Sequence, residues 1–162
     1  MGTVNAHSRI KDLGLELPPA PSPVASYIPT RLVRLDATRS LLYTSGVLPM
    51  VDGQLGYQGA VGSDVDIPTA QQAARVCALN LLSLLEATCG LDHLIQVVQI
   101  TGFVCSASGF NQQPQVLNGA SELLAEVLGE AGRHTRMALG ANELPLGACV
   151  EVSAVFEIGT PA

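Results

Sequence analysis

Residues 134–158 read HTRMALGANELPLGACVEVSAVFEI. Polar and apolar residues alternate over positions 150–158, which predicts a strand with one buried face. The apolar face consists of Val150, Val152, Ala154, Phe156 and Ile158. Residues 134–141 predict a second strand with His134 and Arg136 on the same face. Because the turn-forming residues 142–147 join the two segments, we expect them to form an antiparallel hairpin.

This predicted hairpin brings one arginine close to one glutamate. If the numbers of paired residues add up to an odd number, Arg136 lies opposite Glu151 or Ser153 and its side chain shares a face with that residue. A shift of the pairing by one residue would instead place the two side chains on opposite faces. The pair is either an ordinary cross-strand salt bridge or a binding site. In a site, the planar guanidinium would bind a substrate carboxylate, and the glutamate would orient a water molecule or accept a proton.

The rest of the chain predicts an α+β domain. Strands are expected at residues 27–35, 41–46, 54–58 and 94–105, the first two joined in a hairpin by the turn at 36–39. Asp66 and Pro68 predict the start of a helix that ends before Gly90, and a second helix is expected over residues 114–128 before Gly129. Five prolines between positions 17 and 29 predict an extended arm after a short helical turn at 9–13. We therefore divide the chain into an arm, residues 1–26, and a single domain, residues 27–162.

The composition indicates that the protein associates with copies of itself. The 162 residues include 48% hydrophobic but only 14% charged residues, and the mean hydropathy is +0.34. These charges are too few to cover the surface of a monomer, since an ordinary soluble domain carries about 25%. The richest apolar stretch, residues 76–85, is far shorter than a membrane span. We therefore expect homo-oligomers and no membrane segment.

Charge and cysteine content narrow the partners further. With 8 basic against 14 acidic residues the formal net charge is −6, and no basic run is present, so nucleic-acid binding is not expected. The four cysteines share no metal-binding spacing and are predicted to be reduced and buried. The first residues resemble no secretory signal, which makes a cytoplasmic location the expectation. No metal site and no cofactor are predicted.

The order of several short motifs resembles the RidA family of reactive-intermediate imine deaminases, also called the endoribonuclease L-PSP family. The similarity covers residues 27–156 and includes the motif Tyr43-Thr44-Ser45-Gly46, followed by Asn118 and Arg136. The motif Leu144-Pro145-Leu146-Gly147-Ala148 and the segment Val150-Glu151-Val152 complete the set. The proline-rich arm, Asn118-Gly119-Ala120-Ser121 and Gly132-Arg133-His134 resemble a longer-chain branch of the family. His134-Thr135-Arg136 departs from the Pro-Ala-Arg of the family's archetype.

The resemblance implies a chorismate-mutase-like fold, in which two helices cover one face of a mixed sheet. It also implies a homotrimer around a central barrel, with sites in the clefts between subunits. The implied reaction is hydrolysis of small 2-imino or enamine acids to 2-keto acids and ammonia. The alternative is a trimer that binds small carboxylates without catalysis, and ribonuclease activity is not expected.

The family also implies a role for each candidate residue. Arg136 would bind the carboxylate and Glu151 would hold the attacking water. The residues implied at the substrate are Tyr27, which would close the pocket, Ser45, Gly46 and Asn118. His134 shares the predicted face of Arg136, so it is either a general base or a structural histidine.

Overall fold

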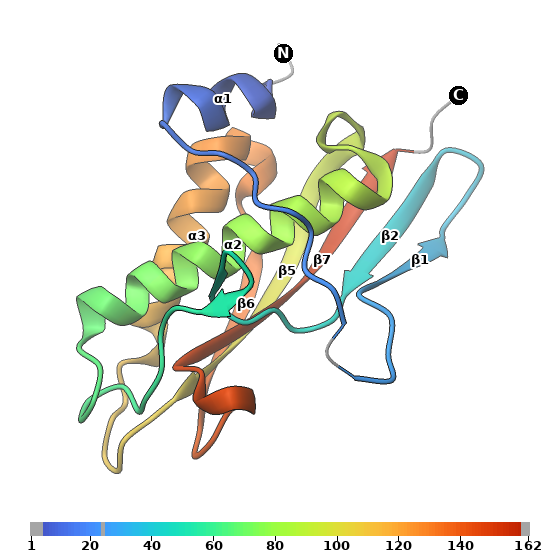
Figure 1. The fold of residues 1–162 in the computed structure, drawn as a ribbon. Coiled ribbons are helices and arrows are strands. Elements are labelled where there is room, and N and C mark those ends of the chain that lie inside the picture. The colour runs from blue at the N-terminus through green and yellow to red at the C-terminus, as the bar shows by residue number, and fades with distance from the viewer. Residues whose placement is uncertain (1–4, 24, 160–162) are drawn as a thin grey trace.

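The computed structural model describes residues 5–23 and 25–159, and their main feature is a five-stranded mixed sheet (Figure 1). The strands are β1 (Thr30–Arg34), β2 (Arg39–Thr44), β5 (Leu94–Cys105), β6 (Thr135–Ala141) and β7 (Val150–Gly159). Their order across the sheet is β1-β2-β7-β5-β6. Only β5 and β6 pair in parallel; the other neighbours are antiparallel.

Two long helices cover one face of this sheet, as Figure 1 shows. Helix α2 (Ile67–Cys89) begins at Asp66, whose side chain accepts a hydrogen bond from the Thr69 amide, and ends at Gly90, which has a φ of 84°. Helix α3 (Gln113–Leu128) ends at Gly129, with a φ of 63°. Both glycines have a positive φ, which glycine adopts without the steric cost that a Cβ would add. The predicted mixed α+β fold with two helices on one face is confirmed.

The core lies between these helices and the inner face of the sheet. Ala70, Ala73 and Cys77 of α2 are fully buried, as are Val152 and Phe156 of β7. All four cysteines are free thiols, and only Cys89 is partly exposed. Ser83, which the sequence places in the polar strip of α2, is instead buried and donates to the Leu79 carbonyl.

The predicted hairpin of residues 134–141 and 150–158 is wrong. The long strand β5 lies between β6 and β7, and it pairs in parallel with β6 and antiparallel with β7. The connection between β6 and β7, which includes the short helix η3 (Pro145–Gly147), crosses the end of β5. Sequence alone favoured the local hairpin because neighbouring segments usually pair, but here β5 pairs along both of its edges and so lies between β6 and β7.

The N-terminal segment folds back over the helices. Helix α1 (Ala6–Asp12) begins three residues before the predicted turn and packs on α3, where Ile10 is buried and Arg9 Nε donates to the Glu126 carbonyl at 3.2 Å. Residues 13–23 then pass over α2 towards β1 (Figure 1). A further short hairpin joins β3 (Met50–Val51) to β4 (Gln54–Leu55), so the strand expected at 54–58 is only two residues long. Short 3-10 turns, η1 (Leu91–His93) and η2 (Gly129–Gly132), follow α2 and α3.

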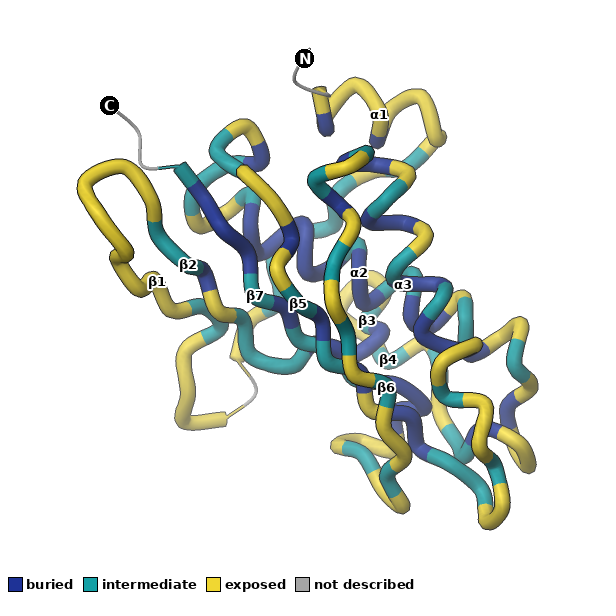
Figure 2. The backbone as a smooth tube through the Cα atoms, turned by 180° about the vertical axis from the view of Figure 1, so that it is seen from behind, coloured by how far each residue is buried: buried dark blue, intermediate teal, exposed yellow. Residues whose placement is uncertain are grey.

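The opposite face of the sheet carries no helix, as Figure 2 shows. Several large apolar side chains are exposed on it, including Val33, Tyr43, Phe103, Met137 and Leu139. No helix of the described residues combines the length and apolarity needed to cross a bilayer.

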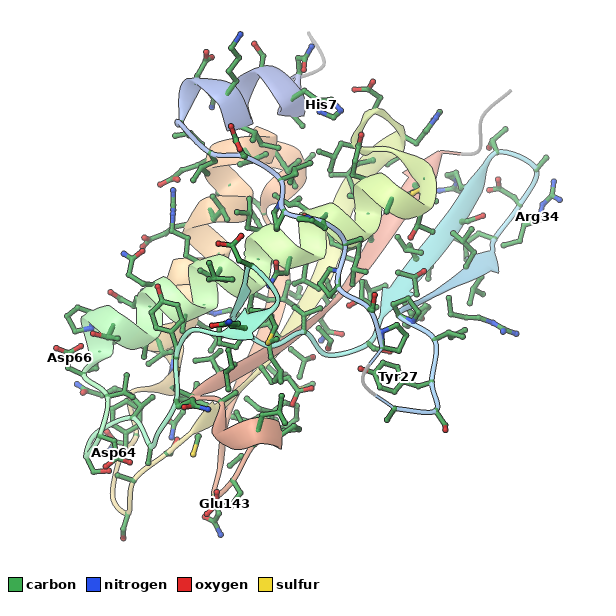
Figure 3. All side chains as sticks on the ribbon, viewed as in Figure 1. His7, Tyr27, Arg34, Asp64, Asp66 and Glu143 are labelled. Atoms are coloured by element: carbon green, nitrogen blue, oxygen red, sulfur yellow. The ribbon has the colours of Figure 1, made fainter. Side chains whose placement is uncertain are left out.

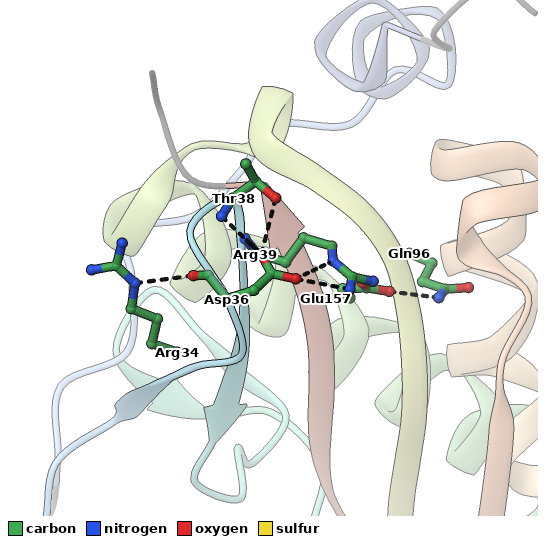
Figure 4. A network of polar contacts seen from close by, with 6 residues as sticks. All are labelled: Arg34, Asp36, Thr38, Arg39, Gln96 and Glu157. Carbon is green, nitrogen blue, oxygen red and sulfur yellow. Dashed lines mark hydrogen bonds and ion pairs between the residues drawn. The ribbon is translucent and has the colours of Figure 1, made fainter.

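A polar network closes one end of this face (Figure 4). The carboxylate of Glu157, which is 9% exposed, accepts hydrogen bonds from Arg39 at 3.2 Å and from Gln96 at 2.7 Å. Arg39 also pairs with Asp36 at 2.8 Å. Hydrogen bonds from the Thr38 amide and the Arg39 guanidinium lower the pKa of Asp36 to about 2. Since every acid has its donor, the network holds β2, β5 and β7 together rather than forming an open site.

Candidate functional site

Arg136 lies on the helix side of β6, where α3 holds its guanidinium in place. Nη1 donates to Ser121 Oγ at 3.1 Å, and Nη2 donates to Asn118 Oδ1 at 2.9 Å and to the Pro114 carbonyl at 3.0 Å. All three acceptors are neutral. Among the described residues the guanidinium forms no ion pair, although the exposed Glu122 lines the same hollow. Arg136 therefore presents a fixed and uncompensated positive charge.

His134 contacts the same Ser121 hydroxyl. Its Nδ1 lies 2.6 Å from the Gly132 carbonyl and its Nε2 lies 3.0 Å from Ser121 Oγ. Because a carbonyl only accepts, Nδ1 carries the proton in the neutral ring and Nε2 accepts from the Ser121 hydroxyl. Burial, opposed by the Gly132 hydrogen bond and aided by the charge of Arg136, lowers the pKa of His134. The ring therefore orients Ser121, and both of its nitrogens are occupied.

These four residues, Asn118, Ser121, His134 and Arg136, are called the arginine cluster below. They line a hollow that opens to solvent and offers about 350 Å³ to a water-sized sphere. Such a hollow suits an anion small enough to reach one guanidinium. The contact of Ser121 with Arg136 and His134 could not be predicted from the sequence. A serine on an amphipathic helix does not indicate its partner until β6 is known to lie beside α3.

A second polar region, the glutamate hollow, surrounds Glu151 of β7. It is lined by Ala25, Tyr27, Ser45, Gly46, Leu48, Pro145 and Glu151 and offers about 500 Å³ to a water-sized sphere. The Glu151 carboxylate rests against Gly46, where an added Cβ would overlap Oε1 and lie 2.8 Å from Cδ. Burial raises the pKa of Glu151. Gly46 thus provides the space that this carboxylate occupies.

The link between the arm and β2 shapes the rim of the glutamate hollow. Ser45 Oγ donates to the Ile28 carbonyl at 2.7 Å, and the Ser45 amide donates to the Pro29 carbonyl at 2.8 Å. Tyr27, labelled in Figure 3 on the segment that leads into β1, is 41% exposed. The Ser45 hydroxyl is therefore engaged in holding the chain that carries Tyr27.

The arginine cluster and the glutamate hollow do not meet within one chain. Arg136 pairs with the buried Ile100, whereas Glu151 pairs with the exposed Phe103. Paired residues share a face, so the two side chains point to opposite sides of the sheet. They also lie two strands apart, about 10 Å at the usual strand spacing. The expectation that Arg136 and Glu151 are neighbours on one hairpin face is therefore wrong.

A mixed sheet with two long helices on one face defines a small α+β protein, and its arginine cluster and glutamate hollow do not meet within the single chain. The chain belongs to the family described as "YjgF/chorismate mutase-like, putative endoribonuclease", whose model matches residues 7–158. The predicted family is thereby confirmed.

Individual relatives match over nearly the whole chain. Protein TCP17 of Trypanosoma cruzi is 39% identical over 153 residues, covering 93% of this chain and 92% of the relative. The solved structure of the Atu1372 protein from Agrobacterium tumefaciens is 43% identical with a TM-score of 0.86, and covers 94% and 92% of the two chains. A solved structure from Shewanella oneidensis, described as a "putative endoribonuclease", is 34% identical with a TM-score of 0.89, and covers 94% and 99% of the two chains.

Proposed function

We propose that this protein hydrolyses small 2-imino or enamine acids to 2-keto acids and ammonia. The observation that carries the proposal is the guanidinium of Arg136, which three neutral oxygens fix in an open hollow without neutralising its charge. Three contacts use three of its five N–H groups, and the remaining donors are free to bind a carboxylate. A fixed cation of this kind selects for a small organic acid.

The reaction needs only a bound water molecule. Water adds to the C=N carbon of the imino acid, the nitrogen leaves as ammonia, and the carbon keeps the oxygen as a ketone. Glu151 would orient the water, accept its proton and pass that proton to the departing nitrogen, and its raised pKa brings it closer to that task at neutral pH. The backbone at Ser45 and Gly46 would lie beside the substrate, and Tyr27 would cover it. No metal or cofactor is part of this proposal.

The complete site would form between copies of the chain. Since Arg136 and Glu151 lie on opposite faces of the sheet, one small substrate cannot reach both in a single chain. A homotrimer that places the arginine cluster of one copy against the glutamate hollow of the next would unite them. The exposed apolar side chains on the face without helices supply a surface for such an assembly.

The decisive experiment measures ammonia and keto-acid release from 2-iminopropanoate and 2-iminobutanoate generated in situ. We expect the wild type to accelerate hydrolysis, and Arg136→Ala to lose this acceleration while keeping its oligomeric mass. Arg34→Ala serves as the matched control, because Arg34 is exposed and contacts only the Asp36 carbonyl. An active Arg136→Ala protein would exclude Arg136 as the carboxylate anchor.

A complementation experiment tests whether the site is shared. Arg136→Ala and Glu151→Gln are each expected to be inactive, whereas trimers assembled from a mixture of both contain some intact interfaces and recover part of the activity. Failure to recover any activity in verified mixed trimers would contradict the shared site.

Non-catalytic binding of a keto acid remains the competing function, and the same variants distinguish it. In that case 2-keto acids would raise the melting temperature of the wild type but not of Arg136→Ala, while no imine would be consumed. RNA cleavage is not what we propose, because the net charge of −6 opposes binding to a polyanion.

A further inference from the structure

A second, apolar hollow lies directly beside the glutamate hollow. The proline arm forms one wall, the segment between β2 and β3 forms another, and one residue of α2 forms the floor. The space inside it that a water-sized sphere can occupy is about 50 Å³. Its lining consists of Pro21, Ser22, Pro23, Tyr27, Pro29, Ser45, Gly46, Val47, Leu48, Met50 and Leu84.

The walls of this apolar hollow are held rigidly. Leu48 and Leu84 are buried, at 8% and 3% exposure. Asn80 of α2, which is 2% exposed, donates from Nδ2 to the Leu48 carbonyl at 3.1 Å and to the Met50 carbonyl at 3.2 Å. The prolines of the arm have a fixed φ and so little freedom to lose when a ligand binds. The hollow is therefore preformed.

The apolar hollow and the glutamate hollow share part of their lining. Tyr27, Ser45, Gly46 and Leu48 line both of them, and the Glu151 carboxylate rests against Gly46. A ligand whose reacting carbon lies beside Glu151 would direct its next carbon atoms past Gly46 towards Leu48.

We infer that the apolar hollow binds the side chain of the acid, and that the protein therefore favours 2-imino and 2-keto acids with aliphatic side chains of several carbons. This inference rests on the proposed function for the position of the reacting carbon. None of the described lining residues is charged. An acidic side chain would lose its hydration there without gaining a partner, which disfavours dicarboxylic acids.

The test measures dissociation constants by calorimetry for four 2-keto acids of increasing length: pyruvate, 2-oxobutanoate, 2-oxopentanoate and 2-oxohexanoate. Each buried methylene is expected to lower Kd about fourfold, the factor that corresponds to ~0.8 kcal/mol at 25 °C. 2-Oxoglutarate is expected to bind no better than pyruvate. The same series of imines, generated in situ, gives an independent slope in kcat/KM.

A pair of neighbouring variants shows whether the apolar hollow causes the slope. Met50→Phe fills it and should remove most of the gain per methylene in both measurements. Val51→Phe is the matched control, because Val51 is 44% exposed and does not line the apolar hollow; it should keep the slope. The readout is the increment between successive acids, which a general loss of stability would not change.

The outcomes separate this inference from the proposed function. If Kd falls along the series of keto acids but no imine is hydrolysed, the proposed deaminase activity is wrong and the assignment of the apolar hollow stands. Imine turnover with equal kcat/KM along the series would keep the deaminase and overturn the inference. A slope that Met50→Phe leaves intact, or the absence of a slope in both measurements, would also overturn it.

Discussion

Gly46 shows how a single missing side chain positions a reactive group. An alanine Cβ at this position would overlap the carboxylate of Glu151, which is the mobile end of a long side chain and can move aside. We expect Gly46→Ala to keep the fold and to lower imine turnover by about 10²-fold, the typical cost of a displacement of 1 Å at a reacting group. Initial rates and a thermal melt would measure the two effects.

Gly56→Ala provides the control for this experiment. An added Cβ there would make only ordinary contacts, at 3.5 Å to Val51 and 3.6 Å to the Pro49 carbonyl. Equal loss of turnover in both variants would show that the space beside Glu151 is not the cause.

His134 makes stability depend on pH. Burial, the largest cause, lowers its folded-state pKa below the ordinary 6.5, so the unfolded chain takes up a proton first as the pH falls. The stability that the neutral ring contributes is complete above pH 6.5 and is lost as the pH falls through 6.5 to the folded-state pKa. Urea unfolding of wild type and His134→Gln at several pH values should show a steeper loss for the wild type. Parallel pH profiles would contradict this.

At the scale of elements, the contact between α2 and α3 depends on Gly119. A Cβ at this position would overlap the backbone carbonyl of Gln71, which cannot move without shifting α2. Helix propensity alone would make Gly119→Ala stabilising by about 1 kcal/mol. We expect the opposite sign, a destabilisation of about 1–3 kcal/mol from overpacking. Denaturant unfolding decides the sign, and a stabilised variant would show that the helices can move apart.

At the scale of the whole molecule, the sheet face without helices is expected to join copies of the chain. Met137 and Leu139 are 47% and 42% exposed on it. Met137→Asp should convert the assembly into monomers of 16.8 kDa, because a charge buried in an interface without a partner is strongly unfavourable. Light scattering after size exclusion measures the mass. Because the proposed site is shared, the monomers should also lack turnover although every site residue is intact.

Leu13→Asp provides the comparison, since Leu13 is equally exposed at 40% but lies at the end of α1. It should leave the mass unchanged. A wild-type protein that is already monomeric would contradict both the assembly and the shared site.

The sequence by itself determined the elements and the family. Asp66 and Gly90 mark the ends of α2, and the alternation in β7 predicts its buried face, because capping and periodicity are local properties. The short motifs from Tyr43 to Val152 identified the family. They did so because backbone positions such as Gly46 tolerate few other residues.

The sequence also predicted the hairpin of β1 and β2 correctly, but only the tertiary structure decided the order of the other strands. β5 separates β6 from β7, so Arg136 meets Asn118 and Ser121 of α3, and Glu151 meets Gly46 on the other face. Pairing over long sequence distances depends on the burial of whole surfaces, and a local pattern of residues does not contain it. The position of the arm beside the apolar hollow could not be predicted from the sequence either, because its prolines fix the conformation of the arm but not the surface on which it packs.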